Sequence, residues 1–206
     1  MSGRADLHPH CLTGQRLRLE PLSMDHGENL WRYADLEVLR PNNMWAGLQT
    51  YEHFVDNIEN LMASSIYMPF AMVLPATGEA VGSSSFMDVR MEHRSLEIGG
   101  TWIAAPYQRT FINPSAKLLM LIHAFENLGC IRVQFRTDLR NIQSQKAMEK
   151  LGCVKEGTMR QHTICYDGYQ RSTVFYSILD SEWPAVKEKL LDRLVRIQLD
   201  NPSDLK

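Results

Sequence analysis

The chain has 206 residues and a formal net charge of -2, and 44% of its residues are hydrophobic while 22% are charged. This length and composition suit one globular domain and argue against disorder except at the ends. The near-neutral charge excludes the strongly basic surface of typical nucleic-acid-binding domains, so an anionic ligand would have to be bound locally.

Four cysteines, Cys11, Cys130, Cys153 and Cys165, are spaced too widely to form a CxxC zinc pair, and the histidines show no metal-ligand spacing. The first ten residues contain no apolar run, and no stretch is long enough to cross a bilayer. We therefore expect a cytoplasmic protein with reduced thiols, without a bound metal and without a nucleic-acid or membrane partner.

Hydrophobic periodicity predicts the secondary structure in chain order. The expected elements are a strand at 15–23, helices at 24–39 and 50–65, a hairpin of strands at 68–75 and 80–89, a strand at 95–104, a helix at 113–129, a strand at 131–138, a helix at 141–152, two strands within 153–179 and a helix at 181–199.

This order predicts a mixed α/β (α+β) fold whose first half is antiparallel. The strand–helix–strand crossing between 97 and 138 should add a local parallel pair. We expect a flexible N-terminus at 1–11, one domain at 12–180, and a C-terminal helix and tail at 181–206.

The decapeptide QRTFINPSAK stands directly before the third long helix. Asn113 is a favoured N-cap and Pro114 a favoured first helical residue. The unpaired amides and the helix dipole at such a start attract anions, Arg109 and Lys117 add positive charge, and Thr110 adds a hydroxyl. The turn therefore predicts an anion site, although it could also be only a well-capped structural helix.

Four segments then carry a resemblance: LTGQRLRLEPLS, LEIGGTWIAAPYQRTFINPSAKLLMLIHAFENLG, IRVQFRTDLRNIQSQKAMEKLGCVKEGTMRQH and DGYQRSTVFYSIL. Over residues 12–180 the chain resembles the GCN5-related N-acetyltransferase (GNAT) superfamily, and most closely its RimJ/RimL-type branch. The resemblance implies a largely antiparallel seven-stranded sheet, flanked by helices and splayed between strands four and five. It also implies acetyl-CoA as the co-substrate.

In that family the turn after the fourth strand wraps the pyrophosphate of acetyl-CoA through the pattern [QR]-x-x-G-x-[GA]. Gln108 fits the first position, but Phe111 stands where glycine is expected and Asn113 where Gly or Ala is expected. A side chain at Phe111 would disfavour a left-handed backbone. The cofactor-binding residues that the resemblance implies are Trp102, Ile103, Gln108, Arg109, Thr110, Phe111, Ile112, Asn113, Lys117, Asn141 and Ser144.

The resemblance also implies catalytic roles. Glu97 is the expected general base for the acceptor amine, with Glu20 as a weaker alternative; Glu97 could equally be a surface glutamate or one that orients a neighbour. Ser144 is expected to steady or protonate the CoA sulfur. Asn141 is expected to grip the pantetheine arm, although asparagine at this position is also a common N-cap.

The acceptor is expected between the loop at 40–49 and the hairpin at 165–172, with Trp45, Tyr166 and Tyr169 as substrate-binding residues. Protein N-termini, amino acids, polyamines and aminoglycosides all remain open as acceptors, and a homodimer is plausible. Two alternatives to a transferase are a GNAT-like module that binds CoA without turnover and an unrelated α/β interaction protein.

Overall fold

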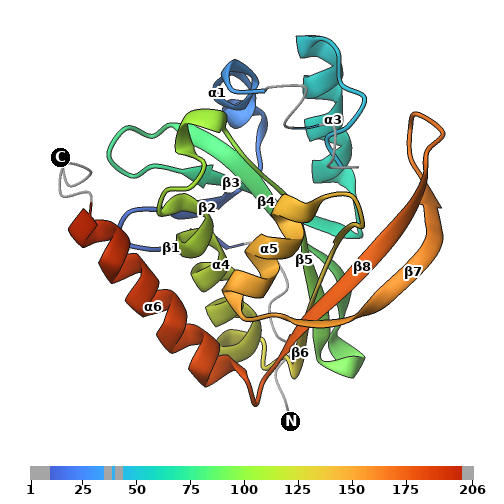
Figure 1. Ribbon diagram of the computed structural model, residues 1–206. Coiled ribbons are helices and arrows are strands. Elements are labelled where there is room, and N and C mark those ends of the chain that lie inside the picture. The colour runs from blue at the N-terminus through green and yellow to red at the C-terminus, as the bar shows by residue number, and fades with distance from the viewer. Residues whose placement is uncertain (1–9, 35–38, 40–43, 201–206) are drawn as a thin grey trace.

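A computed structural model of the chain describes residues 10–34, 39 and 44–200 (Figure 1). It contains one eight-stranded sheet in the order β1-β2-β3-β4-β5-β6-β8-β7. The strands are β1 (Leu12–Thr13), β2 (Arg18–Pro21), β3 (Tyr67–Val73), β4 (Ala80–Arg90), β5 (Ser95–Ile103), β6 (Arg132–Asp138), β7 (Val154–Ile164) and β8 (Gln170–Leu179).

The mixed, largely antiparallel class is confirmed, but the expected count of seven strands is wrong by one. The additional strand is β1, which pairs antiparallel with β2 through two residues. Two residues are too short for alternation to be seen in the sequence.

The helices also follow the predicted order. They are η1 (Met24–His26), α1 (Gly27–Arg32), α3 (Tyr51–Ala63), α4 (Ile112–Ile122) with a π-helical continuation at His123–Asn127, α5 (Ile142–Leu151) and α6 (Trp183–Asp200); short 3-10 turns occur at Met91–His93 and Ala105–Tyr107. Within the described ranges, no helix is both long and apolar enough to cross a membrane. Residues 1–9, 35–38, 40–43 and 201–206 lie outside the described residues, and with them most of the flexible N-terminus predicted at 1–11 and the end of the tail predicted at 181–206.

The helices cover the sheet from two sides (Figure 1). Alternate residues of β5 and β6, such as Leu96, Ile98, Val133 and Phe135, join the larger core cluster with α4, α5 and α6. The other face carries a smaller cluster that includes Trp102 and residues of α1 and α3. Up to Glu97 on β5, and along β6, residues of the opposite parity therefore face away from α4 and α5.

Strands β5 and β6 run parallel and then separate. Their register contains three pairs, the last of which is Glu97 with Gln134. Beyond it, β5 continues to Ile103 and β6 to Asp138 without pairing to each other. We call these unpaired ends, 98–103 and 135–138, the β5–β6 fork. It is the splay expected between the fourth and fifth predicted strands.

A β-bulge in β5 accompanies the fork. Ser85 pairs with Gly99 and Ser83 with Trp102, so two residues of β5 lie opposite one residue of β4. Gly100 within this bulge has φ +62°, a conformation that glycine adopts without strain. Because a bulge bends its own strand, it offers a local reason for β5 to turn away from β6.

The fork also fixes where two helices begin. Helix α4 follows β5 and helix α5 follows β6, so both helices start from the carboxyl ends of parallel strands. Their N-terminal amides, the positive ends of the helix dipoles, therefore lie at the same end of the fork.

Candidate functional site

The turn that leads into α4 differs in detail from its prediction. Helix α4 begins at Ile112 with Phe111 as N-cap residue, so Asn113 is not the N-cap and Pro114 is the third helical residue. The Thr110 hydroxyl decides this start, because it donates to the Tyr107 carbonyl at 2.6 Å and accepts from the Ile112 amide at 3.3 Å. That hydroxyl is therefore engaged within the turn.

Phe111 does not need the conformation that glycine would supply. Its backbone is right-handed, with φ -70° and ψ -14°. The left-handed residue of the turn is Arg109, with φ +64° and an exposed side chain. The guanidinium of Arg16 lies 3.9 Å from the centre of the Phe111 ring, a cation–π contact. Arg16 thus adds a positive charge beside the turn, and no pattern in the sequence indicated that it would lie there.

The resemblance also implied Gln108, Trp102 and Ile103 as cofactor-binding residues. Gln108 uses its side-chain amide locally, donating to the Ile103 carbonyl at 3.1 Å. Trp102 is buried, and its ring packs against Trp45. Trp102 and Ile103 nevertheless belong to the part of β5 that has left β6, so their backbone lies on the β5 arm of the fork.

Lys117 is not at the surface of the turn. Its side chain is 7% exposed, and its Nζ donates to Thr101 Oγ1 at 2.7 Å and to Ser84 Oγ at 3.2 Å. Burial lowers the pKa of this amine to about 7. The amine therefore lies under the sheet beside β4 and β5, where it does not add a charge to the exposed mouth of the turn.

Helix α5 begins at the other arm of the fork. The Asn141 side chain is the N-cap, accepting a hydrogen bond from the Ser144 amide at 3.0 Å. Ser144, in the first turn, is half-buried. Gly152 ends the helix with φ +103°. The capping alternative for Asn141 is thus present in the structure, and its side-chain NH₂ is left for a further contact.

Glu97 is the last β5 residue paired with β6, so it lies at the apex of the fork. It is 2% exposed, accepts from Gln134 Nε2 at 3.0 Å, and pairs with Arg136 Nε at 2.8 Å. Burial raises the pKa of its carboxyl, and this outweighs the lowering effects of Arg136 and Gln134. A buried glutamate with a raised pKa is a recurrent form of general base, although groups in structural ion-pair networks also have perturbed pKa values.

Sequence reasoning missed Gln134 and Arg136. The signal was available in the segment RVQFRTD, where polar residues at 132, 134 and 136 alternate with apolar ones at 133 and 135. Opposite residues in a register share a face, and Glu97 lies opposite Gln134. We call the face that carries Glu97, Gln134 and Arg136 the Glu97 face; it points away from α4 and α5.

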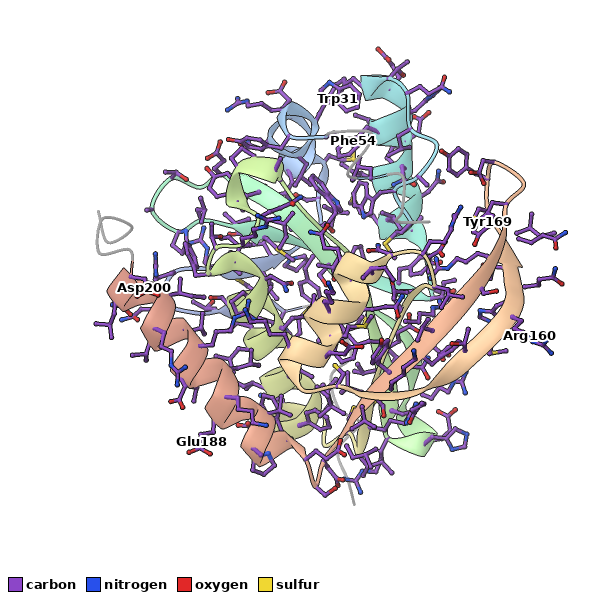
Figure 2. The ribbon with its side chains drawn as sticks, viewed as in Figure 1. Trp31, Phe54, Arg160, Tyr169, Glu188 and Asp200 are labelled. Carbon is purple, nitrogen blue, oxygen red and sulfur yellow. The ribbon has the colours of Figure 1, made fainter. Side chains whose placement is uncertain are left out.

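The two segments expected to hold the acceptor meet in space. A Cβ at Gly47 would lie 3.3 Å from Cδ2 of Tyr166, so the β7–β8 hairpin tip touches the loop before α3. Tyr166 is 60% exposed. The Tyr169 ring, at the end of β8 in Figure 2, lies under the Arg140 guanidinium at 3.2 Å. Trp45 is instead completely buried, against Phe54 and Trp102.

Glu20, the weaker candidate base, lies on β2, which β3 and β4 separate from β5. It pairs with Arg18 at 2.8 Å and with His26 at 3.4 Å. Glu20 is therefore not brought to the fork. Across the described residues, no group of three or more His, Cys, Asp or Glu side chains is arranged to hold a metal ion.

Comparison with known proteins agrees with this geometry. Residues 16–154 match the family model "Acetyltransferase (GNAT) domain". The Bacillus subtilis (strain 168) protein "Putative ribosomal N-acetyltransferase YdaF" is 30% identical over 110 residues, which are 53% of this chain and 59% of that protein. This chain therefore aligns with less than two thirds of that relative.

Two solved structures extend the likeness over nearly the whole chain. A "putative acetyltransferase" from T. thermophilus is 38% identical, covers 90% of this chain and 97% of its own, and has a TM-score of 0.83. Mycobacterium smegmatis RimJ in complex with CoA-disulfide shares the fold at 22% identity, with a TM-score of 0.73 and coverage of 86% and 88%. This chain belongs to the GNAT acetyltransferases.

Proposed function

We propose that the protein transfers the acetyl group of acetyl-CoA directly to a primary amine, either a protein N-terminus or a small-molecule amine, within a ternary complex. The observation that carries this proposal is the β5–β6 fork. It combines a buried glutamate at its apex with two helix N-termini at its open end.

The residues at the fork suit a CoA thioester. The diphosphate would lie at the first turn of α4, at the positive end of the helix dipole, where Arg109 and Arg16 add positive charge. The pantetheine arm would lie along β5 residues 98–103 and pair with backbone groups that β6 does not use. Asn141 and Ser144, at the start of α5, would contact the pantetheine and the sulfur.

Glu97 would act on the acceptor amine. A carboxylate has about four lone-pair sites, and Gln134 and Arg136 occupy two of them. Glu97 can therefore accept the ammonium proton, directly or through a water, before the amine attacks the thioester carbonyl. A backbone amide near Trp102 would stabilise the oxyanion, and Ser144 would donate to the departing thiolate.

The second candidate is a GNAT-like module that binds CoA without turnover. Its main support was Phe111 in place of glycine, and the right-handed backbone of Phe111 weakens that support. Calorimetry with acetyl-CoA and with CoA tests both candidate functions. If the protein binds neither ligand, both the transferase and the CoA-binding module are excluded. Release of free thiol across a panel of amines then separates a transferase from a binding module.

Two variants test the catalytic roles. Loss of general-base catalysis in Glu97→Gln should lower kcat by about 10²- to 10⁴-fold. Loss of one hydrogen bond to a charged sulfur in Ser144→Ala should lower kcat by about 10- to 100-fold. Both variants should bind acetyl-CoA as the parent does, and Lys150→Met, at an exposed site on α5, is the control. An unchanged kcat in either catalytic variant removes that residue from the mechanism.

The remaining expectations stay predictions. A homodimer would be detected by sedimentation, and the exposed strand β7 is one surface that it could use. A cytoplasmic location would be read from fractionation of cells that express the chain.

A further inference from the structure

The Glu97 face continues from β6 onto β8. Arg136 lies opposite Phe175, and Asp138 lies opposite Thr173. Arg171 is two residues before Thr173 on β8, so its side chain shares this face. The Asp138 carboxylate, which Arg140 already pairs, has the largest charge effect on the pKa of Arg171, and the Arg136 guanidinium and the Glu97 carboxylate act on it more weakly. These groups therefore lie within electrostatic reach of Arg171.

Most arginines on this face have a carboxylate partner. Arg136 pairs with Glu97, Arg140 with Asp138, and Arg132 with Glu156. Arg171 has no such pair among the described residues. It is 9% exposed, and its Nε has no hydrogen-bond acceptor. Burial lowers the pKa of its guanidinium, yet an arginine side chain stays charged in proteins.

Other buried polar side chains near Arg171 also lack hydrogen-bond partners among the described residues. Buried polar side-chain atoms in proteins nearly always have a partner, so a group of unpaired ones requires an explanation. Thr173 Oγ1, Thr163 Oγ1 and His162 Nδ1 are also buried without one. Thr163 lies opposite Arg171, and the His162 ring contacts the Phe175 ring, with centres 5.5 Å apart. Most of these atoms can donate hydrogen bonds, and strand pairing puts Thr163 and Thr173 on the same face as Arg171.

Such a set of donors matches a carboxylate. The Arg guanidinium presents a planar fork that fits two carboxylate oxygens, and hydroxyl groups can satisfy the remaining lone pairs. We propose that Arg171 binds a carboxylate of the acetyl acceptor, so that the acceptors are amines that also carry a carboxylate. Polyamines, which are cationic throughout, would be rejected by the same arginine. This inference rests on the proposed transferase function.

The carboxylate could belong to a free amino acid or to an acidic side chain near a peptide N-terminus. Two matched pairs of acceptors distinguish these sources: alanine against alaninamide, and Ala-Asp-Ala-amide against Ala-Asn-Ala-amide. For each acceptor, kcat/KM is measured by thiol release and expressed per deprotonated amine. At least one pair should favour its carboxylate member by about 10- to 100-fold, the range of a charge-assisted hydrogen bond.

Arg171→Gln should remove that preference and leave the affinity for acetyl-CoA unchanged. Arg171→Lys keeps the positive charge but lacks the planar, two-pronged guanidinium, so it should retain part of the preference. The matched control is Arg160→Gln, because Arg160 is exposed on the outer side of β7 and points away from the body (Figure 2). The inference is overturned if the parent protein prefers neither carboxylate member, or if Arg171→Gln keeps the preference.

A binding measurement remains informative if Arg171→Gln does not fold or if no amine is turned over. Calorimetry with CoA present compares N-acetylalanine with N-acetylalaninamide on the parent protein, and the corresponding N-acetylated peptides follow as a second pair. Tighter binding of the carboxylate by about tenfold or more supports the Arg171 site, even where absent turnover refutes the transferase. Equal binding within both pairs overturns the site and leaves any observed transferase activity standing.

Discussion

Replacing Lys117 by methionine should stabilise the protein at neutral pH, although the substitution removes two hydrogen bonds. The amine is buried beneath β4 and β5, and it contacts hydroxyl groups of Thr101 and Ser84 instead of a carboxylate. The neighbouring Cys153 thiol does not offset its charge at pH 7, because burial raises the pKa of that thiol to about 12. Methionine has a similar unbranched shape and needs no hydration.

The magnitude follows from the pKa of the amine. Burial lowers it from 10.5 to about 7, so between these values the unfolded chain binds a proton that the folded chain lacks. Stability therefore rises with pH across this window, and the cost of the buried amine is fully present below pH 7. That cost is about 4 kcal/mol at pH 7, about 3 kcal/mol at pH 8.5 and about 1 kcal/mol at pH 10.

The lost hydrogen bonds oppose this gain by about 1–2 kcal/mol, because Ser84 and Thr101 still bond to each other at 2.7 Å. Lys117→Met should thus be more stable than the parent by about 2–3 kcal/mol at pH 7 and slightly less stable at pH 10. Urea unfolding at several pH values measures the difference, in which the titrations of other groups cancel.

The matched control is Lys150→Met, which removes an exposed ammonium from α5 and corrects for the loss of one charge. The diagnostic quantity is the pH dependence of the stability difference, which should fall by about 3.5 kcal/mol from pH 7 to pH 10. A difference that stays constant with pH would show that Lys117 is hydrated or paired when folded, and would refute the reasoning.

Three further predictions concern the fork. Because burial raises the pKa of Glu97, kcat/KM should decline as the pH falls through a pKa above the usual glutamate range. Glu97→Gln should lose this decline. The same pH profile in the parent protein and in Glu97→Gln would contradict a role as general base. Asn141→Ala should lose about 1 kcal/mol of stability in urea unfolding with the N-cap, whereas Asn141→Asp should keep it; equal losses would exclude the cap as the cause. Arg109→Gly should relieve about 1 kcal/mol of left-handed strain yet weaken acetyl-CoA binding in calorimetry, and tighter binding would argue against a diphosphate at this turn.

The sequence by itself determined the order and type of the main elements. Helical spacing of apolar residues and the stop at Gly152 were sufficient for α5. The ATGE turn indicated the hairpin that contains β4, and the alternation of Val133 and Phe135 indicated β6. The parallel crossing between β5 and β6 followed from the same order, because a strand–helix–strand connection in one sheet has a preferred geometry. These features depend on local preferences that repeat over many residues.

Other features required the tertiary structure. The start of α4 depends on one hydroxyl contact between Thr110 and Tyr107, which no periodic pattern predicts. Lys117, which was expected to add charge at the turn, is buried because the packing of α4 on β4 and β5 decides which side of the helix is covered.

The partners of charged groups were decided only by the register of the sheet. Arg136 and Arg171 look alike in sequence, yet β6 places Arg136 beside Glu97, whereas among the described residues Arg171 on β8 makes no ion pair with a carboxylate. Residues far apart in the chain meet through strand pairing, and the energy of a charge depends on its neighbours and its hydration. A sequence therefore predicts that a charge exists, while only the fold decides whether that charge is paired.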